Sequence, residues 1–118
     1  MFMAKVVILC EKDFQDLELF YPLLRLKEAG HDVIVAGTGE KSYRGKNGYP
    51  LSAVDANIQQ LNAKGFDAVV IPGGWAPDHL RKNAAVLKFV NAMNDDKKPI
   101  AAICHAGWVL CSIPGLLK

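Results

Sequence analysis

The sequence of 118 residues predicts an α/β fold, with helices on both faces of an open and mostly parallel sheet. Continuous apolar runs of strand length recur along the chain, which is typical of strands buried on both faces. Segments with helical character separate these runs, and short loops join them. A chain of this length can bury enough surface for one hydrophobic core, so we expect a single domain.

The first predicted strand and helix establish this pattern. The run Lys5–Cys10 is apolar after its first residue and ends at a charged pair. The segment Leu17–Ala29 is expected to be helical, with Asp16 as its cap and Gly30 as its stop. Pro22 should kink or shorten this helix, because proline has no backbone N–H to donate.

This helix is apolar on more than one side. The stripe expected to face the core consists of Leu17, Phe20, Tyr21 and Leu24. Three further leucines lie off that stripe, namely Leu19, Leu23 and Leu26. A helix that is apolar nearly all round needs a second partner, and we expect these leucines to offer a surface for association between subunits.

The remaining elements alternate in the same way. Further strands are predicted at Asp32–Gly37, Asp67–Ile71 and Ile100–Ile103. Helices are predicted at Ile58–Ala63, Pro77–Asn83, Ala84–Asn94 and Ala106–Ile113. The segment Ser42–Ser52 contains Asn47-Gly48 and predicts a small hairpin beside the main sheet.

Cys104 is the most informative residue, because it lies between the predicted buried strand Pro99–Ile103 and the helix that follows. Such a junction has the logic of a nucleophile elbow, in which small neighbours let a strained turn expose one side chain. The N-terminal amides of the helix would favour the thiolate over the thiol. His105 follows directly and offers a proton acceptor or a cation. The alternative is a buried strand cysteine beside a surface histidine.

Three loops are expected to meet at this place. Cys10-Glu11, Gly73-Gly74 and Cys104-His105 each stand at the carboxyl end of a predicted strand. Ligands of open α/β sheets bind beyond these ends, near a topological switch point. This convergence favours a catalytic Cys104. Trp75 and Trp108 could wall the pocket, although packing is the simpler interpretation of Trp108.

Composition and charge exclude several classes of function. The 14 basic and 12 acidic side chains nearly balance, and no basic stripe with interleaved aromatics predicts a nucleic-acid partner. No apolar stretch is long enough to span a membrane, and the start carries no signal-peptide pattern. Three cysteines without a CxxC spacing favour a reducing compartment, so we expect a cytoplasmic protein. No spacing suits a metal-ligand pair, and no cofactor is expected. Cys10 and Cys111 are interpreted as buried residues.

The chain resembles the PfpI-type intracellular protease family, which is related to the Parkinson-associated protein deglycase and, more distantly, to class I glutamine amidotransferases. The resemblance rests on EKDFQDLELFYPLLRLKEAGHDV, FDAVVIPGGWAPDHLR and KPIAAICHAGWVL, and it covers nearly the whole chain. It implies a flavodoxin-like three-layer sandwich, a cysteine nucleophile and assembly into dimers or hexamers. The activities of the family include peptidase, glyoxalase and deglycase chemistry.

The resemblance also implies roles for particular residues. Cys104 matches the nucleophile and His105 the neighbouring histidine. Asp78 stands where the family usually has a glutamate that reaches the histidine of an adjacent subunit. Gly73 and Gly74 form the turn beside the site, and the amides of Gly74 and His105 are the expected oxyanion donors. An ordinary tight turn is the alternative for the glycine pair.

Two departures from the family pattern stand out. Aligned on Phe14, the position of the glutamate beside the nucleophile is occupied by Gln15, whose amide can donate a hydrogen bond but cannot titrate. Glu18, by contrast, is interpreted as a surface or capping residue. The chain also lacks the strands and closing helix that follow the elbow in the family. We therefore expect a single domain over 1–118 that is truncated at its C-terminal end, with apolar surface left bare.

Three hypotheses follow. The first is a cysteine hydrolase or lyase that acts on small carbonyl compounds or glycated amines through Cys104. The second is a peptidase with the same nucleophile, and the third is a redox sensor or chaperone without catalysis. The expected partners are a small-molecule or peptide substrate and further copies of the chain. Carbonyl chemistry is preferred, because a pocket framed by Trp75, Pro77 and subunit contacts suits small substrates.

Overall fold

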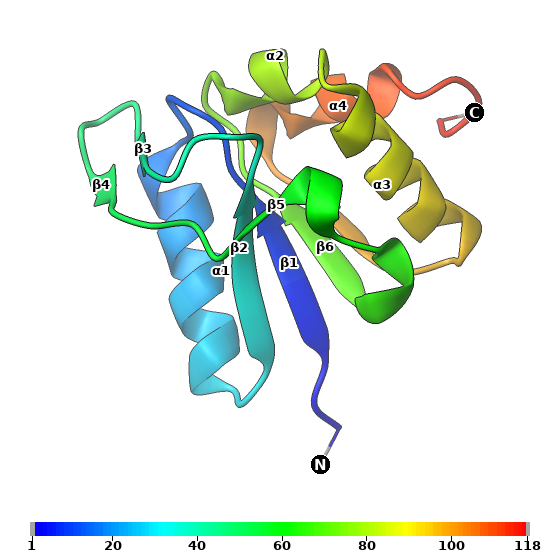
Figure 1. Cartoon of the computed structure of the whole chain (residues 1–118), viewed down its shortest axis with the longest axis horizontal. Coiled ribbons are helices and arrows are strands. Elements are labelled where there is room, and N and C mark those ends of the chain that lie inside the picture. The colour runs from blue at the N-terminus through cyan, green and yellow to red at the C-terminus, as the bar shows by residue number, and fades with distance from the viewer. Residues whose placement is uncertain (1, 118) are drawn as a thin grey trace.

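The computed structural model describes residues 2–117 and confirms the predicted α/β architecture (Figure 1). Its main sheet has the strand order β5-β2-β1-β6-β7, and all neighbouring strands are parallel. The strands are β1 Lys5–Leu9, β2 Asp32–Gly37, β5 Ala56–Asn57, β6 Ala68–Ile71 and β7 Ile100–Ala102. The predicted hairpin is also present, as the antiparallel pair β3 Tyr43–Arg44 and β4 Pro50–Leu51.

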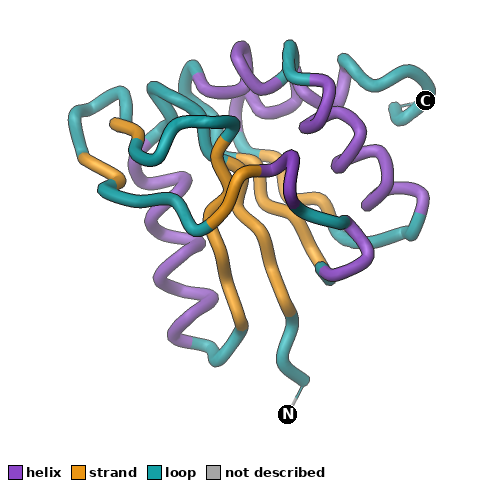
Figure 2. The backbone as a smooth tube through the Cα atoms, viewed as in Figure 1, coloured by secondary structure: helices purple, strands orange, loops and turns teal. Residues whose placement is uncertain are grey.

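The helices lie on both faces of this sheet (Figure 2). They are α1 Asp16–Glu28, α2 Ala76–Leu80, α3 Ala84–Asp95 and α4 Gly107–Cys111. Three 3-10 turns complete the set: η1 Ile58–Gln60, η2 Ala63–Gly65 and η3 Cys104–Ala106. The crossovers β1-α1-β2 and β6-α3-β7 leave the centre of the sheet in opposite directions. Because such crossovers are right-handed, α1 and α3 cover opposite faces.

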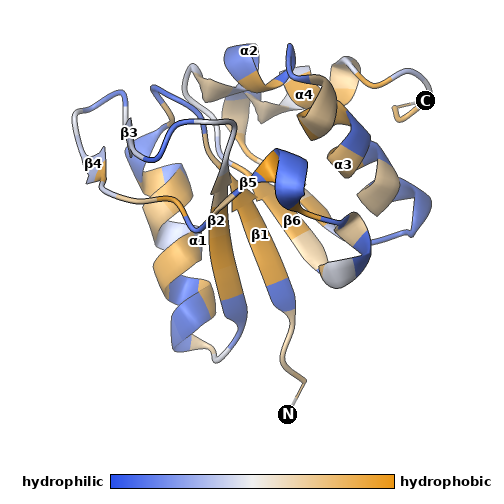
Figure 3. Ribbon diagram, in the orientation of Figure 1, coloured by the Kyte–Doolittle hydropathy of each residue, from blue (hydrophilic) through white to orange (hydrophobic). Residues whose placement is uncertain are grey.

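The core is built around the central strands, where apolar residues gather (Figure 3). In β1, every residue after Lys5 is buried, and Val69 and Ile71 of β6 are fully buried. Such complete burial explains why these strands are continuous apolar runs rather than alternating ones. The edge strand β7 differs, since Ala101 and Ala102 are exposed. The prediction that this strand is buried is therefore wrong, because in the described chain it pairs with β6 alone.

The predicted orientation of α1 is also wrong. Leu19 and Leu23 are buried, whereas Leu17, Tyr21 and Leu24 are exposed. Both sets have helical spacing, so periodicity alone could not decide which of them faces the sheet.

Contacts at the start of α1 set its orientation instead. Gln15 is the N-cap, and its side-chain oxygen accepts a hydrogen bond from the Glu18 N–H. Asp16, the predicted cap, instead accepts hydrogen bonds from the backbone N–H groups of Asn47 and Tyr49 in the hairpin loop. Pro22 lies inside α1 and does not shorten it, since the helix is continuous from Asp16 to Glu28.

Three further predicted helices are shorter in the structure, and one of them, predicted over Pro77–Asn83, is α2, which ends at Leu80. The segment predicted as a helix over Ile58–Ala63 holds η1, and β5, which the sequence analysis missed, pairs with β2 just before it. The helix predicted over Ala106–Ile113 consists of η3 followed by the five residues of α4. A helix of this length has a weaker dipole than one over Ala106–Ile113, so it stabilises a thiolate at Cys104 less than expected. Within residues 2–117, no helix combines the length and the apolar character that a membrane crossing requires.

Candidate functional site

Backbone hydrogen bonds hold three loops together at the carboxyl edge of the sheet. The Gln15 N–H donates to the Gly73 carbonyl over 3.0 Å, and the Trp75 N–H donates to the Asp13 carbonyl over 2.9 Å. Phe14 and Gly74 form an isolated antiparallel bridge between the same two loops. The Ile103 N–H joins the third loop by donating to the Ile71 carbonyl over 3.1 Å. The structure thus confirms the convergence that the positions of the strand ends predict.

Cys104 occupies a strained and exposed turn. Its φ angle is 56°, in the left-handed region that residues other than glycine rarely adopt. For an L-residue this conformation costs roughly 1–2 kcal/mol. The turn is stabilised by the hydrogen bond from the Ala106 N–H to the Ile103 carbonyl. The side chain is exposed, so the alternative of a buried strand cysteine is wrong.

Both glycines after β6 are required by close approach. A Cβ added to Gly73 would lie 2.7 Å from the Cβ of Cys104 and 2.8 Å from the Ile103 carbonyl oxygen. Gly74 has a φ angle of 78°, and a Cβ there would lie 2.5 Å from the Gln15 nitrogen. A side chain at either position would force the loops apart. The turn is therefore more specialised than an ordinary tight turn after a strand.

The carboxylate of Glu18 lies beside Cys104. Its Oε1 accepts a hydrogen bond of 2.8 Å from the Gly73 N–H. The same oxygen and the Cβ of Cys104 both lie within 2.7 Å of the point that a Cβ on Gly73 would occupy, so the two side chains are neighbours. The interpretation of Glu18 as a surface or capping residue is wrong. The Gly73 N–H is already used by this carboxylate, which leaves the amides of Gly74 and His105 as the expected oxyanion donors.

Gln15 has a structural task. Its Oε1 accepts a hydrogen bond of 3.0 Å from the Glu18 N–H and so caps α1. The alignment on Phe14 identified the correct loop, but the residue in that region with a titratable group near Cys104 is Glu18. Gln15 and Glu18 are three residues apart in the first turn of α1. At this spacing the first residue caps the helix, and the second is free to place its carboxylate near Cys104.

His105 lies in a row of aromatic rings that the sequence analysis only partly foresaw. Its imidazole stacks on Trp108 with ring centroids 4.5 Å apart and an interplanar angle of 6°. Trp75 lies on another side, with a centroid distance of 6.1 Å and an angle of 45°. The Arg81 guanidinium lies 5.9 Å from the Trp108 ring. Trp108 therefore contacts the site as well as packing in its helix.

A serine hydroxyl fixes the far end of this row. The Ser112 Oγ donates to the Trp108 carbonyl over 2.7 Å and accepts a hydrogen bond of 3.0 Å from the Arg81 Nε. The guanidinium is therefore held over the indole by a bond outside the ring system. In the sequence, the one indication of the bond from the Ser112 hydroxyl to the Trp108 carbonyl is that the two residues are four positions apart.

Asp78 makes an ion pair on α2 within one chain. Its carboxylate Oδ2 pairs with the Lys82 Nζ at 3.4 Å on the surface of α2. Among the residues that the structure describes, no hydrogen bond joins Asp78 to His105. That Asp78 reaches the histidine of an adjacent subunit therefore stays a prediction, since the structure describes a single chain.

The other two cysteines have contrasting environments. Cys10 is buried at the end of β1, and burial, with a smaller contribution from the Glu11 carboxylate, raises the pKa of its thiol far above the usual range. Cys111, which the sequence analysis placed in the core, is exposed at the end of α4. Accessibility therefore separates Cys104 and Cys111 from Cys10.

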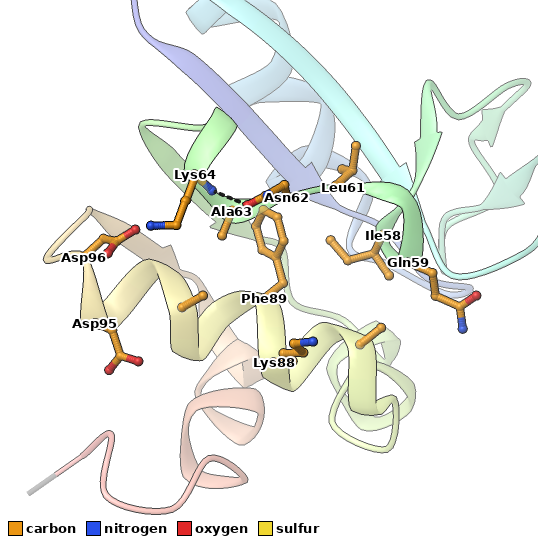
Figure 4. A pocket seen from close by; sticks show the side chains of 12 residues that line it. Ile58, Gln59, Leu61, Asn62, Ala63, Lys64, Lys88, Phe89, Asp95 and Asp96 are labelled. Carbon is orange, nitrogen blue, oxygen red and sulfur yellow. Dashed lines mark hydrogen bonds between the residues drawn. The ribbon is translucent and has the colours of Figure 1, made fainter.

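Two hollows lie away from Cys104. One, of about 560 Å³, is bounded by α3 and by η1 and η2, with Phe89 at its floor (Figure 4). The other, of about 510 Å³, lies beside the hairpin and is lined by Glu11, Lys12 and Arg44, among others. Neither hollow is lined by Cys104 or His105.

Comparisons with known proteins point to one family. The model of the DJ-1/PfpI family matches residues 4–117. A protein of Thermococcus kodakarensis named as a deglycase is 44% identical over 114 residues, which are 97% of this chain and 68% of that protein. Deglycase PfpI of Pyrococcus furiosus is 40% identical over the same shares of both chains. The chain thus spans about two thirds of the length of these relatives.

A solved structure agrees with these matches. Oxidized DJ-1 of Toxoplasma gondii superposes with a TM-score of 0.87 at 28% identity, covering 97% of this chain and 62% of that one. The sheet therefore belongs to a fold of the flavodoxin-like type, as the sequence resemblance implies.

The contrast between the three thiols predicts their reactivity. Under limiting iodoacetamide at neutral pH, we expect Cys104 to be alkylated first and Cys10 to remain unmodified in the folded protein. The reason is that Cys10 is buried and its raised pKa keeps it protonated, whereas Cys104 is exposed on its turn. Peptide-resolved mass spectrometry measures the three rates. Equal rates at Cys104 and Cys111 would show that the turn confers no special reactivity.

Proposed function

Since the chain belongs to the DJ-1/PfpI family, we propose that it is a cysteine-dependent deglycase with glyoxalase-type chemistry, acting on small carbonyl compounds or glycated amines through Cys104. The observation that carries the proposal is the exposed Cys104 on a left-handed turn, with the Glu18 carboxylate as its neighbour. Relatives that are 40% and 44% identical and named as deglycases support the deglycase-type activity.

The chemistry begins with addition of the Cys104 thiolate to an aldehyde carbon, or to the carbon that carries the amine in a glycated substrate. A bond forms between sulfur and carbon, and either the carbonyl oxygen gains a proton or the amine leaves. Negative charge on that oxygen meets the N–H groups of Gly74 and His105, because preorganised backbone donors stabilise such charge.

Glu18 is the group that moves the next proton. Its carboxylate removes a proton from the carbon bonded to sulfur and returns one to the neighbouring carbon, which yields a thioester of a 2-hydroxy acid. Water then cleaves the thioester and frees Cys104. The hydrogen bond from the Gly73 N–H holds the carboxylate in place for this transfer.

The peptidase and sensor hypotheses use the same cysteine but need different surroundings. A peptidase must hold an extended chain across the nucleophile, and it has no need of a group that moves a proton between two neighbouring carbons. A sensor without catalysis requires an oxidisable thiol and has no need of a proton-transferring neighbour. The adjacency of Glu18 favours turnover of carbonyl compounds over both.

Removal of the nucleophile tests the proposal directly. Cys104→Ala should abolish conversion of methylglyoxal to lactate while the far-UV circular dichroism and Tm stay close to those of the parent. The side chain is exposed, so its loss opens no cavity in the core. Cys111→Ala is the matched control, because Cys111 is also exposed, and it should retain turnover. Full activity of Cys104→Ala would place the chemistry elsewhere.

A second pair of variants separates Glu18 from Gln15. Glu18→Gln should lower kcat by about 100-fold or more, because an amide can still accept from the Gly73 N–H but cannot carry a proton. Gln15→Glu should leave kcat nearly unchanged, since a carboxylate oxygen can cap α1 equally well. Steady-state kinetics on both variants, with Tm as the control, measures this. A gain of activity in Gln15→Glu would return the proton-transferring role to that position.

Assembly provides a further test, since we also propose that the site is completed by Asp78 of an adjacent copy. Asp78→Asn should weaken catalysis more than stability, by removing the charge that orients His105. Mixing inactive Cys104→Ala with inactive Asp78→Asn should then restore part of the activity, because a hybrid interface contains one intact site. No restoration after confirmed subunit exchange would mean that each chain builds its own site.

A further inference from the structure

Trp75 presents an open indole at the edge of the candidate site. Its side chain is 55% exposed, although it directly follows the Gly73-Gly74 turn. The backbone on both sides is fixed, because its N–H donates to the Asp13 carbonyl and its carbonyl accepts from the Asp78 N–H over 3.1 Å. An exposed tryptophan on an immobilised segment is unusual, since large aromatic rings generally bury most of their surface.

The neighbouring rings leave this indole as the open end of a row. One face of the His105 imidazole is covered by Trp108, and the Arg81 guanidinium lies over the Trp108 ring. Trp75 approaches the same imidazole at an angle of 45°, so the two rings are not stacked on each other. Trp108 is only partly exposed, so Trp75 is the more accessible of the two tryptophans beside Cys104.

Distance places this surface within reach of a bound substrate. The Trp75 and His105 ring centroids are 6.1 Å apart, and His105 directly follows Cys104. On the other side, Gly73 approaches the Cβ of Cys104 so closely that no side chain fits between them, and Trp75 is two residues further along. A substituent carried one bond from the reacting carbonyl group can therefore extend over the indole.

We propose that Trp75 is a stacking subsite for a flat aromatic group, so that the site prefers aryl-substituted 2-oxoaldehydes to methylglyoxal. This inference rests on the proposed function, whose reacting residue is Cys104. Offset or edge-to-face pairing of aromatic rings adds to the gain from burying apolar surface, and together these effects favour a phenyl over a methyl substituent. A cyclohexyl ring of similar size buries apolar surface but cannot form the aromatic pairing.

The reaction with phenylglyoxal balances without an outside oxidant. The Cys104 sulfur bonds to the aldehyde carbon, a proton leaves that carbon, and a proton is delivered to the neighbouring carbon. The aldehyde carbon is thereby oxidised and the ketone carbon is reduced. Water cleaves the resulting thioester, so phenylglyoxal and one water give mandelate, and the thiol is regenerated.

The test compares kcat/KM for phenylglyoxal, cyclohexylglyoxal and methylglyoxal, with the hydroxy acids quantified by chromatography. In the parent protein, phenylglyoxal should be preferred to both other compounds. In Trp75→Ala, the ratio of kcat/KM for phenylglyoxal to that for methylglyoxal should fall about tenfold, mainly through KM. Trp75→Phe should retain much of the ratio. Tyr21→Ala is the matched control, because Tyr21 is 69% exposed on α1, and it should leave the ratio unchanged.

Other outcomes overturn the inference. An unchanged ratio in Trp75→Ala, or equal preference for the phenyl and cyclohexyl compounds, would show that Trp75 is not a stacking subsite. A second measurement on the Cys104→Ala protein follows the indole N–H signal of Trp75 by NMR during titration with mandelate and with lactate. If the parent converts no oxoaldehyde but mandelate alone shifts this signal, the proposed function fails and the subsite stands. If mandelate shifts nothing, the subsite fails whatever the activity.

Discussion

The close approach of Gly73 to Cys104 and Glu18 is the constraint on which the rest of the site depends. A Cβ at Gly73 would lie 2.5 Å from the Glu18 carboxylate and 2.7 Å from the Cys104 Cβ. Because there is none, the loops after β1, β6 and β7 can meet and the Gly73 N–H can bind the carboxylate. Cys104, the Glu18 carboxylate and the Gly73-Gly74 turn all take their positions from this contact. The parallel sheet brings the strand ends to one edge, and the absence of a side chain at Gly73 lets the loops come into direct contact.

Sequence patterns predicted the sheet well because burial on both faces leaves an unmistakable signal. The central strands and the elbow at Cys104 follow from continuous apolar runs and from small residues around one cysteine. The short strand β5, with only two residues, carries no such signal. The face of α1 that packs on the sheet could not be predicted either, since its two leucine-containing stripes are equally periodic and its contacts with the hairpin loop depend on the tertiary fold.

The role of Glu18 illustrates a different limit. Alignment on Phe14 selected Gln15, which is adjacent in sequence, whereas the helix projects the residue three positions later toward Cys104. A site that combines a loop with the first turn of a helix follows the helical period, so neighbouring residues in the sequence point to different places. The aromatic row was only partly predicted, because Trp108 follows His105 by three residues whereas Trp75 belongs to a loop that only the tertiary fold brings to the same histidine.

Pro22 bears on the same first turn of α1. In an unbroken α-helix, the N–H of residue 22 would donate to the carbonyl of Glu18, but proline has no N–H to give. The main chain of Glu18 is therefore held less by its own helix than by groups outside it, namely the Gln15 cap at its N–H and Gly73 at its carboxylate. The Glu18 carbonyl thus lacks the helical hydrogen bond that any other residue at position 22 could donate. A continuous helix therefore omits one main-chain bond at the residue whose carboxylate lies beside Cys104.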